Sequence, residues 1–382
     1  MKKLLILHNK YRDIGGEDIA VNNEVSLLKK FYEVETLIYS NEVENYGQQI
    51  FSFLSNNNKK SVKRLEERIE NFKPDLVYVH NTWFKASLGV FRLLKEKKIK
   101  TVIKLHNFRY ECTRSFLIFK HLSKKKQCGA CGLTKKWYTV INKYYPDSYF
   151  KSFLINKYGK KYLKILKNDG FDLFVLTNFQ KHKLKKLGIS ENRIRVVPNY
   201  LEATKKKDSK ESGGYFLYAG RVSSEKGINE LISVFEKLKL QNIELKIIGQ
   251  GPIYEKILKD LNSENIEIIG EVPNDKVLDY IENSKAVVTA TKLFEGQPTL
   301  LCEASMLGVP SIFPNTGGVL EFFPQDYIYS FEQFNYKDLE EKIINVNDTN
   351  SAKKQGEYNK RFIMDYLSKE KIINHFEKIL NV

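Results

Sequence analysis

Short apolar runs alternate along this chain with longer segments whose apolar residues recur at helical spacing. The pattern opens with an apolar run at Leu4–His8, a turn at Gly15-Gly16 and a helical segment from Glu17. Strand, glycine-rich turn and helix in this order open a nucleotide-binding type of α/β unit. The pattern predicts further strands at Val34–Tyr39, Asp75–His80, Thr101–Leu105, Leu173–Thr177 and Arg195–Pro198, and helices near Val62–Phe72, Leu88–Lys97, Phe150–Leu166 and from Asn178. Such alternation predicts a parallel sheet covered on both faces.

A polar stretch interrupts the alternation at residues 203–214, where lysine and serine dominate and two glycines close the segment. We predict a linker there. A second α/β run follows, with strands expected at Tyr215–Ala219, Ile243–Ile248, Ile266–Ile269, Ala286–Thr289 and Pro310–Phe313, a helix at Ile228–Leu238, and helical sequence after Gln355 with a break near Ser368. The chain is therefore expected to form two doubly wound domains, at 1–202 and 215–359.

The segment from Phe294 to Pro310 carries two glutamates eight positions apart, Glu295 and Glu303. Proline and glycine punctuation predicts a helix from Pro298 or Thr299 to Gly308. Its first N–H groups, including those of Thr299 and Leu300, lack helical partners and suit a phosphate. Glu303 lies one turn further along the same face, where its carboxylate can accept hydrogen bonds from a ribose. This spacing predicts a nucleotide-diphosphate site, with Glu295 on the other side of the phosphate.

The loop Gly220–Gly227 places Arg221 and Lys226 between a strand end and a helix start. Ligands of such sheets bind at the carboxyl ends of the strands, and two cations there can neutralise a diphosphate. The alternative is a solvated loop with a surface arginine. Gly249-Gln-Gly251 lacks the third glycine of a dinucleotide fingerprint, which indicates a tight turn and disfavours a dehydrogenase.

These motifs together resemble the donor half of family-4 retaining glycosyltransferases: Gly220-Arg221 with Lys226-Gly227, then Gly249-Gln-Gly251-Pro252, then Glu295 and Glu303-Ala304. The first half agrees, since Gly15-Gly16-Glu17-Asp18 and Leu105-His106-Asn107-Phe108-Arg109 resemble capsular and exopolysaccharide members. The resemblance implies the GT-B architecture, an α/β fold of two Rossmann-like doubly wound domains facing a cleft. It also implies that the last helix, about residues 360–382, packs back on the first, acceptor-side domain.

The resemblance assigns roles residue by residue. Arg221 and Lys226 would bind the donor diphosphate, Glu303 the ribose, and His106 the sugar and β-phosphate side. Glu295 and the segment Gly296, Gln297, Pro298, Thr299 and Leu300 would hold the transferred sugar and the phosphates. Gly15 and Gly16 would let the first-domain loop approach the phosphates, and Val272 would contact the base. The alternative is a purely structural role for His106, because a histidine after a strand is commonly a hydrogen-bonded structural residue.

The chemistry implied is transfer of a hexose with retention of configuration. Cations and helix N-termini stabilise the departing diphosphate as its charge develops. A diphosphate leaves readily, so the carboxylic acid that glycosidases need is dispensable. No Asp-x-Asp sequence occurs, which argues against a metal-bridged diphosphate. We therefore expect no cofactor and a metal-independent enzyme.

Three cysteines, Cys112, Cys128 and Cys131, have spacing that could supply thiolates to zinc. A fourth ligand is missing where related sequences have a cysteine, although His121 is nearby. Packed or free thiols are the preferred interpretation. Cys302 is expected to be a small buried residue.

The formal net charge is +17, and the stretch from Lys143 to Lys210 holds 17 Lys and Arg against 6 Asp and Glu. Aromatic residues lie among these lysines: Tyr144, Tyr145, Tyr149, Phe150, Phe153, Tyr158 and Tyr162. The stretch is either a solvated basic face or a surface that docks on anionic lipid. No apolar run reaches the roughly 18 residues of a membrane span, and the run after Met-Lys-Lys is too short for a signal peptide.

We therefore predict a bacterial glycosyltransferase of capsule or related polysaccharide biosynthesis, cytoplasmic and peripheral on the inner face of the cell membrane. It would take a UDP- or GDP-sugar as donor and a lipid-linked saccharide as acceptor. One alternative is a glycolipid synthase with a diacylglycerol or phospholipid acceptor. Another is a basic nucleic-acid-binding protein, which would leave Glu295 and Glu303 without a purpose; we expect no nucleic-acid partner.

Overall fold

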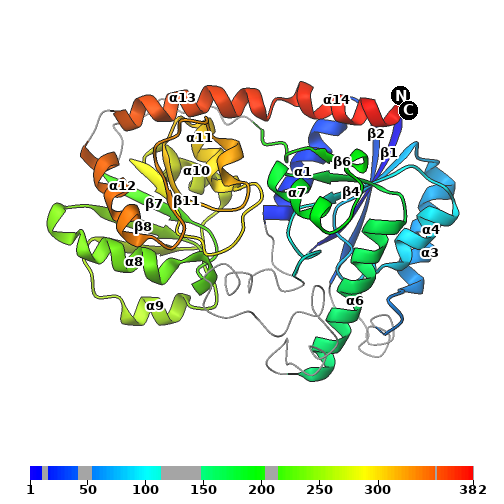
Figure 1. The fold of residues 1–382 in the computed structure, drawn as a ribbon, viewed down its shortest axis with the longest axis horizontal. Helices are drawn as coiled ribbons and strands as arrows, with labels where there is room; N and C mark the ends of the chain where they lie inside the picture. The colour runs from blue at the N-terminus through cyan, green and yellow to red at the C-terminus, as the bar shows by residue number, and fades with distance from the viewer. Residues whose placement is uncertain (11–15, 42–53, 113–147, 203–213, 349–350, 382) are drawn as a thin grey trace. The chain divides into compact units, whose positions relative to one another are not determined.

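The computed structural model describes residues 1–10, 16–41, 54–112, 148–202, 214–348 and 351–381 (Figure 1). These residues form two compact units. The first unit contains the described residues within Met1–Ser115, Gln127–Leu201 and Leu367–Val382, and the second contains those within Glu202–Tyr366. Each unit is built around one parallel sheet, so the prediction of two parallel-sheet α/β domains is confirmed.

The sheet of the first unit has six described strands in the order β2-β1-β3-β4-β5-β6. Its strands are β1 (Lys3–Lys10), β2 (Glu33–Ser40), β3 (Leu76–Val79), β4 (Thr101–Leu105), β5 (Asp172–Val175) and β6 (Ile194–Val196), all paired in parallel. The apolar runs β3 and β4 are buried along their whole length, as expected for central strands covered on both faces. The order reverses at β1, so the carboxyl ends of β1 and β3 mark the switch point where such sheets bind ligands.

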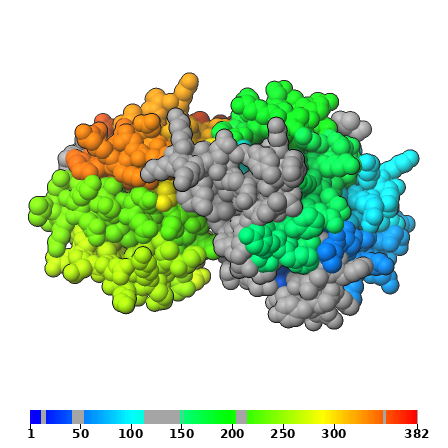
Figure 2. Space-filling view, turned by 60° about the horizontal axis from the view of Figure 1, so that its bottom comes forward, coloured from blue at the N-terminus to red at the C-terminus, as the bar shows by residue number. Residues whose placement is uncertain are grey.

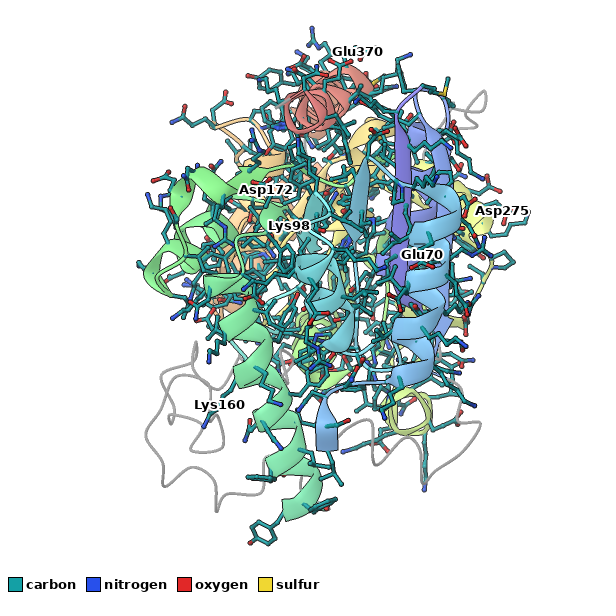
Figure 3. The ribbon with its side chains drawn as sticks, turned by 90° about the vertical axis from the view of Figure 1, so that its right-hand side faces the viewer. Glu70, Lys98, Lys160, Asp172, Asp275 and Glu370 are labelled. Atoms are coloured by element: carbon teal, nitrogen blue, oxygen red, sulfur yellow. The ribbon has the colours of Figure 1, made fainter. Side chains whose placement is uncertain are left out.

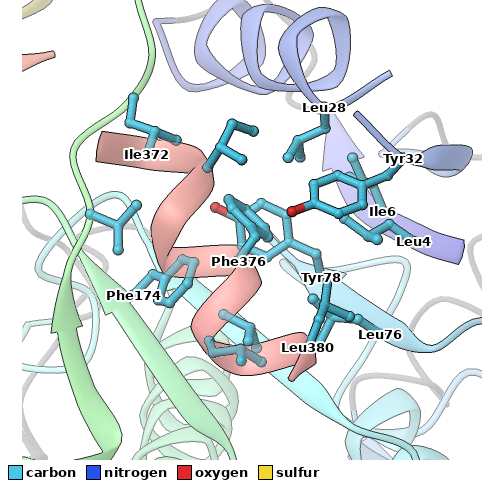
Figure 4. Packing of buried hydrophobic residues seen from close by; sticks show 14 of the residues in the cluster. Leu4, Ile6, Leu28, Tyr32, Leu76, Tyr78, Phe174, Ile372, Phe376 and Leu380 are labelled. Atoms are coloured by element: carbon cyan, nitrogen blue, oxygen red, sulfur yellow. The ribbon is translucent and has the colours of Figure 1, made fainter. Parts of the chain in front are cut away.

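Helices connect these strands: α1 (Gly16–Leu28), α3 (Lys59–Phe72), α4 (Gly89–Glu96), α6 (Tyr149–Asn168) and α7 (Asn178–Lys186). A further helix, α14 (Lys369–Leu380), belongs to this unit although it ends the chain. Phe376 of α14 packs edge-on against Tyr78 and Phe174, with ring centroids 5.1 and 5.4 Å apart (Figure 4). The apolar face of α14 thus completes the core under β1, β3 and β5.

The sheet of the second unit has the described order β12-β11-β10-β7-β8-β9. Its strands are β7 (Tyr215–Ala219), β8 (Glu244–Ile248), β9 (Ile266–Gly270), β10 (Ala286–Val288), β11 (Ser311–Asn315) and β12 (Ser330–Glu332). Its helices are α8 (Ile228–Lys237), α9 (Tyr254–Asp260), α10 (Asn274–Glu282), α11 (Thr299–Met306), α12 (Tyr336–Asp348) and α13 (Ser351–Tyr366). β12, a three-residue edge strand, is absent from the sequence prediction.

Helix α13 holds α11 in place through a close backbone contact. A Cβ added to Gly356 would lie 2.1 Å from the carbonyl oxygen of Gly308, so only glycine permits this approach. Gly308 itself ends α11 with φ +76°, and Asn359 of α13 donates a hydrogen bond to Ser305 of α11. These contacts hold the C-terminal half of α11 against α13.

The prediction that the aromatic residues of α6 lie on its surface is wrong for two of them. Tyr158 and Tyr162 are buried, with 2% and 6% exposure, and Tyr158 donates a hydrogen bond to the carbonyl of Thr82. Tyr149, Phe150 and Phe153, in the first two turns, are 56%, 55% and 47% exposed. The side chain of Lys160 extends away from α6 (Figure 3). The green region that includes α6 lies at the surface on the face that Figure 2 shows. Tyr144, Tyr145, His121 and nearly all of the predicted linker at 203–214 lie outside the described residues.

Candidate functional site

The second unit brings two of the predicted loops together at its switch point. The sheet proceeds from β7 to β8 and β9 on one side, while β10 pairs with β7 on the other. The loop Gly220–Gly227 follows β7 and the loop that contains Glu295 follows β10. Neighbouring parallel strands end at the same sheet edge, so the predicted phosphate and sugar residues come from adjacent positions.

Lys226 and Glu295, 69 positions apart, form an ion pair with 2.6 Å between Nζ and Oε1. Thr291 Oγ1 donates a second hydrogen bond to the same carboxylate oxygen at 2.8 Å. The side chains of Lys226 and Glu295 are 31% and 21% exposed, so the pair is open to a ligand. Thr291 is a site residue that the sequence prediction missed. Its signal was its place in the loop after β10, four residues before Glu295.

The loop around Glu295 is held on both sides. Gly318 N donates to the carbonyl oxygen of Glu295 at 3.0 Å, and Thr316 Oγ1 donates to the carbonyl of Leu293 at 3.0 Å. Gln333, just after β12, donates to the carbonyls of Thr291 and Leu293. Hydrogen bonds from three residues therefore hold the loop that carries the Glu295 carboxylate.

Helix α11 begins at Thr299, with Pro298 as its N-cap residue in extended conformation. Proline therefore precedes the helix and does not occupy its first position. Cys302 N donates to the carbonyl of Pro298 at the start of the helix, so the N–H groups of Thr299 and Leu300, which precede it, lack intrahelical acceptors. The helix presents positive partial charge at this end.

Glu303 is half-buried one turn into α11. Burial raises the pKa of its carboxyl from 4.5 to about 7. Within the described part of the chain no cation forms an ion pair with this carboxyl. A buried carboxyl without a counter-charge suits hydroxyl groups, which can donate hydrogen bonds to it and compensate its lost hydration.

Close backbone contacts explain why the loops after β7 and β8 have glycine at two positions. A Cβ on Gly227, whose φ is +76°, would lie 1.9 Å from the carbonyl oxygen of Ala290, and one on Gly249, whose φ is +125°, would lie 2.0 Å from that of Gly220. The turns after β7, β8 and β10 thus pack backbone to backbone. The Arg221 residue is exposed, and its carbonyl accepts a hydrogen bond from Tyr218 at 3.0 Å.

Other predicted donor-side residues lie near this edge with less distinctive contacts. Gln297 forms a side-chain hydrogen bond with the buried thiol of Cys302. Gly296 is half-buried between Glu295 and Gln297. Val272, also half-buried, follows the end of β9.

The first unit places His106 directly after β4 and His80 directly after β3. His80 Nδ1 and His106 Nε2 share a hydrogen bond at 2.8 Å. The predicted motifs meet here: Asn107 donates to Glu17 at 3.2 Å, and His8 is hydrogen-bonded to Asp18 at 2.8 Å. The glycine-rich segment and the Leu-His-Asn-Phe segment are therefore brought together. Gly16 begins α1 and is exposed.

A charged group that the sequence prediction missed lies beneath His106. Lys104 of β4 forms an ion pair with Glu24 of α1, and Tyr78 donates to Glu24 at 2.9 Å. Burial lowers the pKa of the Lys104 ammonium, an effect that the Glu24 carboxylate opposes. Burial, and then the positive charge of Lys104 and the nearby His8, lowers the pKa of His106 well below its ordinary value. His106 is therefore neutral at neutral pH.

The remaining predicted residues are Gly15 and the cysteines, and the structure describes only some of them. Gly15, Cys128 and Cys131 lie outside the described residues. Cys112 and Cys302 are buried free thiols. Among the residues that the structure describes, no group of three His, Cys, Asp or Glu is arranged to hold a metal ion. None of the helices in the described part of the chain is both long and apolar enough to cross a membrane.

Residues 200–362 match the family described as glycosyl transferases group 1, a range that includes nearly all of the described second unit and its site. The amylovoran biosynthesis glycosyltransferase AmsD of Erwinia amylovora is 27% identical over 120 residues, 30% of this chain and 34% of that protein. TuaC of Bacillus subtilis strain 168, named for teichuronic acid biosynthesis, is 35% identical over 107 residues, 28% of this chain and 26% of that protein. These matches span about a third or less of the relatives' own length.

A longer match joins the chain to the alpha-monoglucosyldiacylglycerol synthase of Acholeplasma laidlawii, 23% identical over 259 residues, 66% of this chain and 61% of that protein. Among solved structures, Anabaena HepE in complex with UDP and glucose superposes with a TM-score of 0.65 at 12% identity, over all of both chains. Sucrose-phosphate synthase from Thermosynechococcus elongatus gives 0.71 at 13% identity, over 100% of this chain and 98% of that one. The chain thus has the GT-B fold, and residues 200–362 are similar to the group 1 glycosyltransferases.

Proposed function

We propose that the protein is a retaining, metal-independent hexosyltransferase of surface polysaccharide synthesis. It moves a sugar from a nucleotide-diphosphate sugar to a lipid-linked saccharide. The second unit binds the donor and the first unit the acceptor. The protein works in the cytoplasm as a peripheral protein on the inner face of a bacterial cell membrane.

The arrangement of Lys226, Glu295 and α11 carries this proposal. A cation and a helix N-terminus lie on loops of one sheet edge, and the half-buried carboxyl of Glu303 follows one turn into the same helix. A nucleoside diphosphate has the matching parts: two anionic phosphates and a ribose with two hydroxyl donors. HepE, a similar fold, has been solved with UDP and glucose, which supports a nucleotide-sugar donor.

The proposed chemistry uses the cations on the leaving group. As the bond between the sugar and the phosphate breaks, negative charge grows on the diphosphate, where Lys226, Arg221 and the start of α11 stabilise it. Glu295 releases Lys226 to the phosphate and accepts hydrogen bonds from sugar hydroxyls. Neither Glu295 nor Glu303 acts as a general acid, because a diphosphate leaves without protonation.

A panel of UDP- and GDP-sugars tested by thermal shift identifies the donor, because a ligand that binds the native state raises its stability by mass action. Glu303→Gln should weaken binding of the stabilising nucleotide about tenfold, the loss expected for hydrogen bonds to a charged acceptor. Glu236→Gln is the matched control, since Glu236 is exposed near the far end of α8. Equal affinity for both variants would refute the ribose role of Glu303.

A second acceptor class has its own support. The relative named alpha-monoglucosyldiacylglycerol synthase matches 66% of this chain, which favours a diacylglycerol or phospholipid acceptor as the alternative. Once the donor is known, transfer of radiolabelled sugar to polyprenyl-diphosphate-linked saccharide or to diacylglycerol separates the two. Product from diacylglycerol alone would replace the polysaccharide proposal with the glycolipid one.

A further inference from the structure

Three histidines lie on three neighbouring strands at the carboxyl edge of the first sheet. His8 is in β1, His80 follows β3 and His106 follows β4, in the strand order β1-β3-β4. The His80 and His106 rings are stacked at 5.1 Å, and His8 meets the His80 ring edge-on at 6.2 Å. Beyond His80 lies Glu24, whose Oε2 is 3.9 Å from His80 Nε2. His106, His80 and Glu24 thus form a line that leads inward from the sheet edge.

The inner end of this line is fully buried. Glu24 is 1% exposed, and Lys104 and Tyr78 are 0% exposed. A buried ion pair is weak evidence for stability, because well-packed apolar residues of similar volume commonly serve as well or better. The proposed catalysis does not use Glu24 or Lys104 directly. Glu24 and Lys104 lie next to the histidines of the candidate site, so we considered whether the pair acts on those histidines.

Burial lowers the pKa of His80 well below its ordinary value, as it does for His106, so both imidazoles are neutral. The hydrogen bond between them can run in two directions. In the first, His106 Nε2–H donates to His80 Nδ1, and the proton of His80 is on Nε2, facing the Glu24 carboxylate. In the second, His80 Nδ1–H donates to His106 Nε2, and the bare Nε2 of His80 faces that carboxylate. The first places N–H against an anion, and the second places a lone pair against it.

The unpartnered nitrogens favour the same direction. His106 Nδ1 is buried and has no hydrogen-bond partner among the described residues. His80 Nε2 is likewise buried without a hydrogen-bond partner among these residues, so each direction leaves one buried N–H without an acceptor. In the first direction that N–H faces the Glu24 carboxylate at 3.9 Å, whereas in the second it lies on His106, which is close to the Lys104 ammonium. An N–H group without an acceptor costs less beside an anion than beside a cation, so the first direction is favoured.

We propose that Glu24, acting through His80, is a positioning device that holds His106 as the neutral Nε2–H tautomer. Tyr78 and Lys104 hold the Glu24 carboxylate in place, Tyr78 through Oε2 and Lys104 through Oε1. A ring held in this way has one hydrogen-bonding position left, the Nδ1 lone pair. That nitrogen can accept a hydrogen bond from a hydroxyl group and cannot donate one to a phosphate oxygen, which assigns His106 to the sugar and not to the diphosphate. Because Nδ1 is buried in this structure, the contact requires the surrounding side chains to move when the donor binds. The role in turnover rests on the proposed function, but the tautomer does not.

Nitrogen NMR of protein labelled with ¹⁵N-histidine tests the tautomer directly, because bare and protonated imidazole nitrogens resonate far apart. His106→Phe assigns the signals. The wild type should show His106 with a protonated Nε2 and a bare Nδ1. A protonated Nδ1 on His106 would overturn the proposal whether or not the protein transfers sugar.

Three variants test the chain of contacts. His80→Asn keeps an acceptor oxygen near the position of Nδ1 and should preserve the His106 tautomer, whereas His80→Phe should give a mixture. Glu24→Gln combined with Lys104→Met removes the carboxylate without leaving a buried cation and should also give a mixture. His182→Gln, on exposed His182 of α7, is the control that leaves the His106 signals unchanged.

Turnover provides the second readout. His80→Phe should lower kcat roughly tenfold or more with the donor KM within about twofold, and His80→Asn should restore most of kcat. A structural role alone would move the thermal stability of both His80 variants together and would not separate their kcat values. Equal kcat for His80→Phe and wild type, or His106 tautomers that do not respond to His80→Phe, would overturn the proposal.

Discussion

Glu303 shows how one carboxyl links the stability of the second unit to pH. Its pKa is raised by burial from 4.5 to about 7, so the folded protein keeps a proton that the unfolded chain releases. Stability from this group is therefore full below pH about 4.5 and falls as pH rises toward about 7. Relative to Glu303→Gln, the wild type should lose about 1–2 kcal/mol across this window, a figure reduced for solvent that reaches the carboxyl.

Denaturant unfolding of both proteins at several pH values measures this difference. The two curves should run parallel below pH about 4.5 and again above about 7, and diverge between. Glu236→Gln, which changes an exposed carboxylate, should track the wild type throughout. A constant offset between wild type and Glu303→Gln across the whole range would contradict the raised pKa.

Lys226 is the other residue whose role can be isolated. Lys226→Ala removes the cation assigned to the diphosphate and frees Glu295, so kcat/KM should fall by about a hundredfold or more. Lys237→Ala, an exposed lysine at the end of α8, should leave it unchanged. Addition of Arg221→Ala to Lys226→Ala should lower the rate further, since both are assigned to the same phosphates. Steady-state kinetics with the identified donor settles the comparison, and a normal rate in the double variant would remove the diphosphate assignment.

The elements were predicted well where periodicity is strong. β4 and β7 have the expected bounds, and the break near Ser368 separates α13 from α14. β12 was missed because an edge strand of three residues gives no periodic signal. The Lys104–Glu24 pair was missed for a different reason: charged residues are expected at the surface, and their burial depends on a tertiary partner 80 positions away. Lys226 and Glu295 were predicted for one site, but their direct contact and Thr291 required the fold.

Helix α6 is the element whose surface bears on membrane binding. It has six lysines and no acidic residue, and Phe150 and Phe153 are exposed in its first two turns. We expect this end to dock on anionic headgroups with the aromatics at the interface. Phe150→Ser with Phe153→Ser should reduce sedimentation with phosphatidylglycerol vesicles several-fold, while phosphatidylcholine vesicles bind neither protein. Tyr358→Ser with Met364→Ser, exposed apolar residues of α13, is the control; equal loss there would indicate nonspecific adhesion.

At the scale of the whole molecule, the chain leaves the first unit, forms the second and returns, since α14 completes the core of the first unit. Each unit has its own buried core, so calorimetry should resolve two unfolding transitions. Phe376→Ala removes a ring packed on Tyr78 and Phe174 and should lower only the transition of the first unit, by about 3–5 kcal/mol. Phe235→Ala, which empties a site beside Phe216, should lower only the other.

The shift of the unfolding transitions on addition of the donor nucleotide then shows which unit binds it. At a hundred times its Kd, the donor nucleotide should stabilise the second unit by about 2.7 kcal/mol. Because Lys226, Glu295 and Glu303 all lie in that unit, the shift should survive Phe376→Ala and disappear with Lys226→Ala. A nucleotide shift confined to the transition that Phe376→Ala lowers would place the donor on the first unit and refute the division of roles. A single transition moved by both phenylalanine variants would instead mean that the two cores unfold as one.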